Sequence, residues 1–256
     1  MELFEKIDLG NGLYATKWHA LYHEPTRSVI CSDLHLGYER AMVGQGVMFP
    51  LGQFEKIIEK FQALFSAFKV ESVVLNGDVK HEFGRGSYQQ ESEVRKLLGF
   101  LSGKCEKVHV VKGNHDNYLK EFCKGFERVE FHEKQLTLDG LLITHGAEAV
   151  ANYSSKTLVM GHQHPSIVLR DEVGAQMKLP CFLHKKGFAI TPAMSPLSAG
   201  TEALRGSATG FLGRVLESEG IGSFTPIAVS PDGLLGLPKL SRLQRLSGKS
   251  LFFEQE

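Results

Sequence analysis

Residues 28–37 read "SVICSDLHLG", a short apolar run that leads directly into an acid and a histidine one residue apart. The apolar run is typical of a buried strand, so Asp33 and His35 would follow its carboxyl end. A single Asp-x-His at such a place is more often a cap or a turn than a metal site. Its interpretation therefore depends on which residues stand at the ends of the other strands of the chain.

Four further runs repeat this arrangement. Apolar residues at 71–76, 107–112, 140–144 and 156–160 predict strands, which lead into "NGDVKHEF", "KGNHDN", "THG" and "GHQHP". Ligands of open α/β sheets bind beyond the carboxyl ends of the strands, so we expect these clusters to converge on one edge of the sheet. Without a cation, so many imidazoles and carboxylates would be left unpaired and crowded. The sequence therefore predicts a metal centre.

The residue types in these clusters indicate which metals suit the centre. Asp, Asn and His occur together without cysteine, which suits Mn, Fe, Zn, Co or Ni better than Ca or Mg. A pair of ions needs one carboxylate that bridges them. Asp78, between a glycine and a short loop, is the natural candidate.

The segments between and after these strands indicate the fold. A period of 3.6 residues over 51–68, behind Pro50, predicts a helix that covers the sheet, and Ser87 is a candidate N-cap for a second helix. From 166 to about 192 three strands follow one another without helices, which predicts a β-meander. We expect an α/β (α+β) fold and one layered domain over residues 1–256, in which sheets pack together under flanking helices. The segment 201–256 is less defined.

Composition excludes several classes of protein. Lys+Arg and Asp+Glu balance at 29 each, so bulk charge predicts neither general nucleic-acid nor membrane affinity. No stretch approaches the roughly 20 apolar residues that span a bilayer, and no signal peptide is evident. The cysteines are scattered, which is typical of reduced thiols in a cytoplasmic protein: Cys31, Cys105, Cys123 and Cys181.

The five clusters also resemble a known family. "SDLHLG", "NGDVKH", "KGNHD", "THG" and "GHQH" resemble, in type and order, the motifs of calcineurin-like metallophosphoesterases. The form "GDVKHEFG" and the later "LPCFL" and "TPAMSPLSAG" resemble the branch of small archaeal phosphoesterases and bacterial phosphoesterases associated with DNA ligases and helicases. The resemblance implies a four-layer αββα sandwich of two mixed sheets flanked by helices, with the metals at the strand tips.

The resemblance also assigns roles to the clustered residues. It implies two divalent ions, Mn²⁺ foremost with Fe, Zn, Ni or Co as alternatives. Their ligands would be Asp33, His35 and His164 on one ion, Asn114, His145 and His162 on the other, and Asp78 between them. His115 would lie near the phosphate, where it stabilises charge or protonates the leaving oxygen. Asp116 would pair with the His115 ring.

These roles predict a binuclear metal-dependent phosphoesterase. Two ions neutralise the growing charge and acidify a bridging water, which attacks the phosphorus. We expect a phosphodiester substrate, such as a cyclic nucleotide, a dinucleotide or a nucleic-acid end. The alternative is a DNA-repair-associated nuclease, with a nucleic acid or a DNA-repair protein as partner, although neutral net charge argues against duplex binding. A non-catalytic scaffold is disfavoured because every ligand position is filled.

Three loop residues are candidates for contact with the substrate: His81, Arg40 and Arg85. His81 stands where many relatives of this kind have an acid. For both arginines the alternative is an ordinary solvated loop charge. The segment 37–50 is either a lip over the site or a simple connection.

Leucines and basic residues alternate near the end of the chain and predict a short helix or an irregular tail. In a helix, Lys239, Arg242, Arg245 and Lys249 would form a basic ridge. Such a ridge is either a solvated face over the leucines or a contact for a nucleic-acid backbone.

Overall fold

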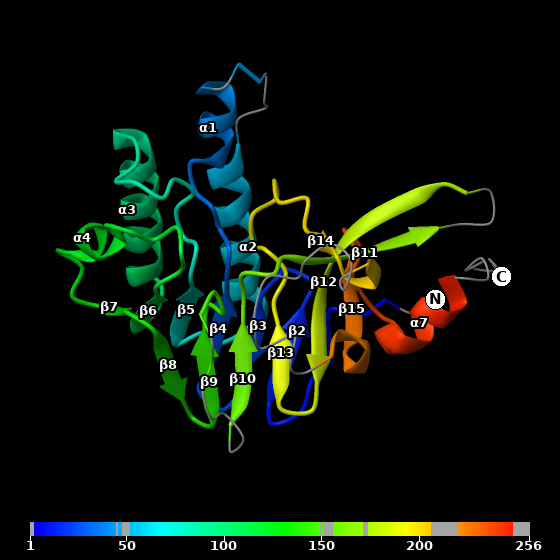
Figure 1. Ribbon diagram of the computed structural model, residues 1–256. Helices are drawn as coiled ribbons and strands as arrows, with labels where there is room; N and C mark the ends of the chain where they lie inside the picture. The colour runs from blue at the N-terminus through cyan, green and yellow to red at the C-terminus, as the bar shows by residue number, and fades with distance from the viewer. Residues whose placement is uncertain are drawn as a thin grey trace.

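The computed structural model describes residues 3–44, 46–47, 52–148, 150, 156–170, 174–205 and 220–247. In this part of the chain two mixed β-sheets pack face to face (Figure 1). Helices cover the outer face of each sheet. This confirms the four-layer αββα sandwich. No described helix combines the length and the apolar composition needed to cross a membrane.

The first sheet runs in chain order and changes from antiparallel to parallel pairing at its centre. Its strands are β1 (Lys6–Asp8), β2 (Leu13–Thr16), β3 (Leu21–His23), β4 (Ser28–Cys31), β5 (Ser72–Asn76), β6 (Lys107–Val111) and β7 (Val129–His132). Pairing is antiparallel from β1 to β4 and parallel from β4 to β7. The predicted strands β4, β5 and β6 are confirmed. The sequence did not reveal β1, β2, β3 and β7, which are too short to show a clear period.

The second sheet contains the other two predicted motif strands and the meander. Its main path is β14 (Thr201–Glu202), β11 (Pro165–Arg170), β12 (Gln176–Lys185), β13 (Phe188–Ile190), β10 (Thr157–Met160), β9 (Leu141–Thr144) and β8 (Gln135–Leu138). Off this path, β15 (Thr225–Val229) pairs with β12 and β16 (Leu234–Gly236). The predicted meander is confirmed as the antiparallel run β11–β12–β13.

Alternate residues of the central strands face two different apolar layers. On β4, Val29 and Cys31 pack on the helix side, whereas Ile30 packs between the sheets. On β10, Val159 packs between the sheets, and its neighbours Leu158 and Met160 face the outside of the second sheet. Both faces of these strands are buried, so they appear in the sequence as continuous apolar runs.

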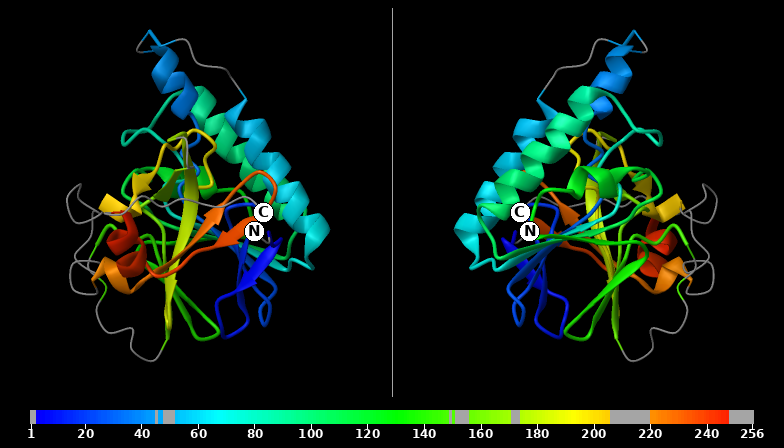
Figure 2. Two further views of the ribbon diagram at one scale, coloured as in Figure 1. Left: turned by 90° about the vertical axis from the view of Figure 1, so that its right-hand side faces the viewer. Right: turned by 90° about the vertical axis from the view of Figure 1, so that its left-hand side faces the viewer.

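Both predicted long helices lie on the first sheet. They are α2 (Gln53–Ala67) and α3 (Tyr88–Ser102), and Figure 2 shows them side by side across its outer face. The predicted cap of α3 is confirmed, because the Ser87 side chain accepts a hydrogen bond from the backbone N–H of Gln90 at 3.2 Å. The expected start of α2 at Pro50 and Leu51 lies outside the described residues.

The segment 37–50 contains a helix, α1 (Tyr38–Gly44), that is tied to α2. The carboxylate of Glu39 accepts hydrogen bonds from the backbone N–H groups of Gly52 and Gln53, at 2.9 and 3.0 Å. These amides lie at the N-terminus of α2, where a helix favours negative charge. In its described part the segment is therefore an anchored connection.

Shorter helices complete the outer layers. They are α4 (Leu119–Cys123), the 3₁₀ turns η1 (Ala203–Arg205) and η2 (Ile221–Ser223), and α7 (Leu240–Ser247). In α7, Leu240 and Leu243 are buried against the second sheet, and Arg242 and Arg245 are exposed. The C-terminal leucine pattern thus forms a helix with a solvated basic face, on the far side of the molecule from α3 (Figure 1). Lys249 lies outside the described residues.

Candidate metal centre

The five polar clusters converge, but not on the edge of one sheet as the sequence suggested. Asp33, Asp78 and Asn114 follow β4, β5 and β6 of the first sheet. His145 and His162 follow β9 and β10 of the second. Because the sheets pack face to face, the ends of both strand sets meet. The centre therefore lies between two sheets.

The loops that carry the candidate ligands have an unusual backbone conformation. Positive φ angles of 42–67° occur at five of them: Asp33, His35, Asp78, His162 and His164. Residues other than glycine rarely adopt this left-handed region, and they keep it only where the surrounding structure enforces it. The turn breaks the alternation of a strand, so donors two residues apart can point to the same place.

Asp33, His35 and His164 form the first group of donors. Oδ1 of Asp33 lies 3.0 Å from Nε2 of His164, which lies 3.3 Å from Nε2 of His35. The other Asp33 oxygen accepts hydrogen bonds from the Ser32 hydroxyl at 2.7 Å and from the His162 backbone N–H at 3.0 Å. The carboxylate is fully buried and firmly oriented.

His145 is at the centre of the second group. Its Nε2 lies 3.1 Å from Oδ1 of Asn114 and 3.2 Å from Nδ1 of His162. Oδ2 of Asp78 lies 3.3 Å from this same Nε2, and 3.8 Å from Nε2 of His35 in the first group. Asp78 therefore stands between the two groups, as a bridging carboxylate would.

The hydrogen bonds around His145 show why the centre calls for a cation. Its Nδ1 lies 3.0 Å from the Asn76 carbonyl oxygen, which can only accept, so Nδ1 carries the proton. In the neutral ring Nε2 is then an acceptor that faces the Asp78 and Asn114 oxygens, which also accept. Burial disfavours a charged ring, yet Asp78 and Asp33 raise the pKa of His145 to about 9. The site therefore favours positive charge, which a bound divalent ion would supply.

Groups behind the donors fix their orientation. Nδ1 of His164 lies 2.9 Å from the Ser198 hydroxyl, so its Nε2 faces the first group. Metal-binding histidines are usually held by such an outer partner. Nitrogen and oxygen donors without sulfur suit an intermediate divalent metal. The residues therefore fit metal ions, and they do not identify the metal.

The structure does not pair Asp116 with the ring of His115, although the sequence predicted this pair. The Asp116 carboxylate accepts hydrogen bonds from the backbone N–H groups of Val79, Lys80 and Gly113, at 2.9–3.2 Å. It makes no hydrogen bond to the His115 ring in the described part of the chain. Nδ1 of His115 instead bonds the carbonyl of His81. The expected Asp116–His115 pair is therefore wrong, because the aspartate is buried among amides of the loops.

Lys80 is a residue that the sequence reasoning missed. Although charged, it is fully buried, and its Nζ donates hydrogen bonds to the carbonyls of Glu82, Gly84 and His115. It thereby ties the loop after β5 to the loop after β6. A lysine between the motif residues Asp78 and His81 was the available signal, but nothing local says where its ammonium goes.

Of the three expected substrate residues, only His81 lies at the centre. Its ring stacks with His115 at a centroid distance of 5.6 Å, and its Nδ1 has no hydrogen-bond partner among the described residues. Phe83, 57% exposed, also stacks on the His115 ring, at a centroid distance of 3.8 Å. Arg40 lines a different hollow, together with Glu55. Arg85 is exposed, and its charge acts on Glu121 of α4.

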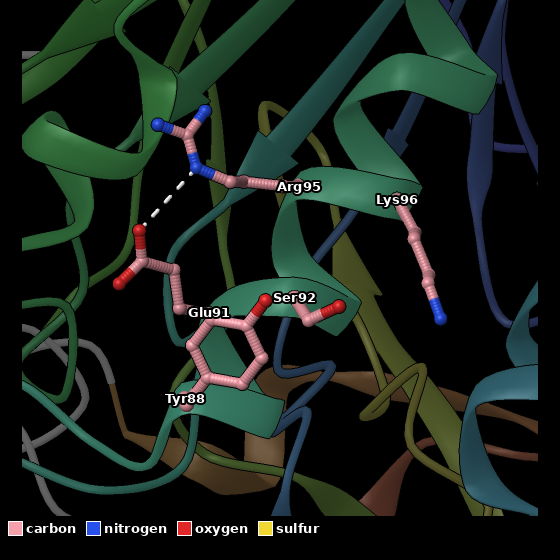
Figure 3. A pocket seen from close by; sticks show the side chains of 5 residues that line it. All are labelled: Tyr88, Glu91, Ser92, Arg95 and Lys96. Atoms are coloured by element: carbon pink, nitrogen blue, oxygen red, sulfur yellow. Dashed lines mark hydrogen bonds and ion pairs between the residues drawn. The ribbon is translucent and has the colours of Figure 1, made fainter.

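A cavity adjoins the candidate centre. It has a volume of about 320 Å³, and its wall includes His164, Lys178 and the turn 196–200. A second hollow, of about 440 Å³, lies over α3 (Figure 3). Its wall contains Tyr88 and the Arg95–Glu91 ion pair, and none of the clustered metal donors. Of these two hollows in the described part of the chain, the cavity beside His164 is the one that adjoins the candidate donors.

Comparisons with known proteins agree with this geometry. The family model "calcineurin-like phosphoesterase" matches residues 26–173, which contain all five motifs. The crystal structure of Pseudomonas putida nuclease MPE is similar with a TM-score of 0.64 at 18% sequence identity. That similarity covers 91% of this chain and 98% of the other. A search of curated proteins returned no match.

Proposed function

The chain belongs to the calcineurin-like phosphoesterase family and is a phosphoester hydrolase, and we propose that it cleaves a phosphodiester with two divalent metal ions. The position of Asp78 carries this proposal. One carboxylate oxygen stands 3.3 Å from His145 of one donor group and 3.8 Å from His35 of the other. We take Mn²⁺ as the first candidate metal, with Fe, Zn, Ni and Co as alternatives.

The ligand assignment follows the two donor groups. Asp33, His35 and His164 would hold one ion, Asn114, His145 and His162 would hold the other, and Asp78 would serve both. When bound, the ions would withdraw charge from the phosphate oxygens and acidify the attacking water. The protein keeps the two groups in place through the buried carboxylate of Asp33 and the left-handed turns.

His115 is proposed to give a proton to the leaving oxygen. Its Nδ1 donates to the carbonyl of His81, so the ring is oriented and Nε2 faces the centre, 3.8 Å from Oδ2 of Asp78. Nε2 must hold a proton at the moment of bond cleavage for this role. Asp116 has a positioning role, since it holds the backbone N–H groups on which both motif loops rest.

The cavity beside His164 supports a small organic diester. About 320 Å³ lies within the usual range of small-molecule pockets. His81 and the exposed ring of Phe83 offer contacts on the His115 side. We therefore favour a cyclic nucleotide, a dinucleotide or a nucleic-acid end. Arg40 and Arg85 remain weaker candidates for substrate contact, because no described contact joins them to the centre.

A DNA-repair-associated nuclease is the alternative. The solved structure of similar fold is named a nuclease, and at 18% identity it supports a common fold for the two chains. Neutral net charge gives no general affinity for duplex DNA. A DNA-repair protein as partner belongs to this alternative.

The four described cysteines are free and buried, in keeping with a proposed cytoplasmic location.

Hydrolysis of bis-p-nitrophenyl phosphate with Mn²⁺ tests the reaction. Asp78→Asn keeps the shape of the side chain and removes the bridging charge, so turnover should fall by about three orders of magnitude, equivalent to several kcal/mol. Asp232→Asn, at an exposed turn, is the matched control and should retain full activity. Absence of turnover by the unmodified protein with every divalent metal would overturn the proposal.

A substrate panel separates the two classes of diester. We expect faster turnover of 2′,3′-cyclic nucleotides or dinucleotides than of single-stranded or duplex DNA labelled in its interior. Faster cleavage of internal DNA bonds would refute the small-diester assignment and favour the nuclease.

A further inference from the structure

A second group of histidines lies within the first sheet. His109 is on β6, and Glu130 and His132 are on the neighbouring parallel strand β7. Figure 1 labels both strands. The strand register sets His109 opposite Glu130 and Val111 opposite His132. The alternate residues of β7, Val129 and Phe131, pack on the helix side of the sheet. The three polar side chains therefore share the other face.

Their polar atoms converge on one point. Nδ1 of His109 lies 3.0 Å from Nε2 of His132. One Glu130 oxygen lies 3.9 Å from the His109 nitrogen, and the other lies 3.9 Å from the His132 nitrogen. The side chains of His109 and His132 are only 10% and 16% exposed. The two imidazoles and the carboxylate would hold a cation from one side. The other side of the cation would be open at the edge of the sheet.

The chemistry of the three groups fits an intermediate divalent metal. Burial, together with the neighbouring ring, lowers the pKa of His109 to about 4, so the ring is neutral and able to bind a metal. Two imidazole nitrogens and one carboxylate oxygen suit Zn²⁺, Co²⁺ or Ni²⁺ better than Mg²⁺ or Ca²⁺. A water molecule would complete a tetrahedral Zn²⁺ site.

Lys107 competes for the carboxylate. Its Nζ lies 2.5 Å from Oε2 of Glu130, and the two side chains are 51% and 48% exposed. An exposed ion pair of this kind contributes at most about 1 kcal/mol. It therefore does not prevent Glu130 from turning to a bound ion.

We propose that His109, Glu130 and His132 form a further divalent-metal site, separate from the centre at the strand ends. His109 and Asn114 are five positions apart along the chain, which corresponds to roughly 15 Å in an extended strand. An ion here would join β7 to β6, the strand that leads to Asn114 and His115. The site stabilises the sheet beneath the catalytic loops, and it takes no part in phosphoester hydrolysis.

Metal content measures this site directly. The full chain is dialysed against Zn²⁺, and bound zinc is determined by mass spectrometry. We expect His132→Gln to bind one ion fewer per chain than the unmodified protein. His184→Gln, which removes a histidine outside both groups, should bind the same amount as the unmodified protein. The comparison does not depend on how many ions the main centre holds, so it is independent of the proposed reaction.

A second variant keeps the test valid if His132→Gln does not fold. Glu130 is exposed, so Glu130→Gln should fold, and its zinc affinity should fall at least about tenfold, as even the loss of an outer partner costs 10–100-fold. Zinc should also raise the unfolding temperature of the unmodified protein more than that of either variant. Equal zinc content and affinity in the unmodified protein and the folded variants would overturn the proposal.

Discussion

The candidate metal centre and the group of His109, Glu130 and His132 are built in different ways. β6 takes part in both, through His109 within the strand and Asn114 and His115 beyond its end. Within regular strands, donors share a face only with alternate residues and cross-strand neighbours. At the strand ends, left-handed turns remove that restriction. Two neighbouring strands therefore bring together three candidate donors at the edge of the sheet. The strand ends bring together seven candidate donors in a buried centre.

The largest effect should come from the ring at the end of β6. His115→Gln removes the proposed proton donor, so turnover of a diester with an alkyl leaving group should fall about 10²–10⁴-fold. The loss should be much smaller with a p-nitrophenyl leaving group, which needs no proton. Rates measured for both substrates check this, with His184→Gln as the control. Equal losses for both substrates would show that His115 does not protonate the leaving group.

The second-largest effect concerns Gly113, which follows β6 and leaves no room for a side chain beside Asp78. A Cβ on Gly113 would lie 2.2 Å from both the backbone nitrogen and Oδ1 of Asp78, so Gly113→Ala must displace that carboxylate. A misplacement of this kind costs about 100-fold in rate.

The matched control is Gly99→Ala, inside helix α3. The closest atom to its added Cβ is a Phe126 ring carbon at 3.6 Å, an ordinary contact. This change should leave the rate unaltered and stabilise the protein by about 0.5–1 kcal/mol. For both variants, the metal-dependent turnover rate and the free energy of unfolding in urea are measured. A fully active Gly113→Ala protein would show that the close approach to Asp78 is unnecessary.

Lys80 tests how two strand-end loops are held together. Lys80→Met leaves the carbonyls of Glu82, Gly84 and His115 without their charged donor. Because the His115 loop is then less ordered, we expect kcat to fall about tenfold, which corresponds to 1.4 kcal/mol, while KM changes less. Steady-state measurements of kcat and KM for the variant and the unmodified protein check this. The same loss in the exposed control Lys96→Met would contradict a positioning role.

The smallest effect concerns His19, which shares the left-handed backbone of several candidate metal ligands but has different neighbours. His19 has φ 62°, in the same left-handed region as five of the candidate metal ligands, but it faces the Ala193 carbonyl and Lys60. Burial and the Lys60 charge lower the pKa of His19 from 6.5 to about 3, whereas the carboxylates raise that of His145. The folded protein therefore binds this proton less readily than the unfolded chain, and acid favours unfolding.

His19→Asn should reduce this acid sensitivity. The contribution of His19 to stability is fully present above pH 6.5 and is lost as the pH falls toward about 3. Asparagine tolerates the left-handed backbone. Thermal unfolding at pH 7 and pH 4 should therefore show a smaller decrease for the variant, at about 2–4 °C for each kcal/mol of stability that His19 loses. Parallel decreases in both proteins would mean that His19 does not titrate in this range.

Much of the candidate centre was predictable because its signal is local. Asp33 and His35 follow β4 directly, and His162 and His164 follow β10 in the same way. Each strand, its turn and its donors occupy a few consecutive residues, so one can recognise them without knowing the fold. The error over Asp116 arose because adjacency in the chain does not fix a side-chain partner. The buried Lys80 was missed because its three acceptors come from two loops.

By itself the sequence determined the central strands, the two long helices, the meander and the candidate metal donors, since these depend on periodicity and on residue type at strand ends. Only the tertiary structure decided that β9 and β10 belong to a second sheet, so that His145 and His162 meet Asp78 across an interface. It alone joined His109 to His132, which are 23 residues apart. Pairing between strands depends on burial and register over the whole sheet, and no short stretch of sequence contains that information.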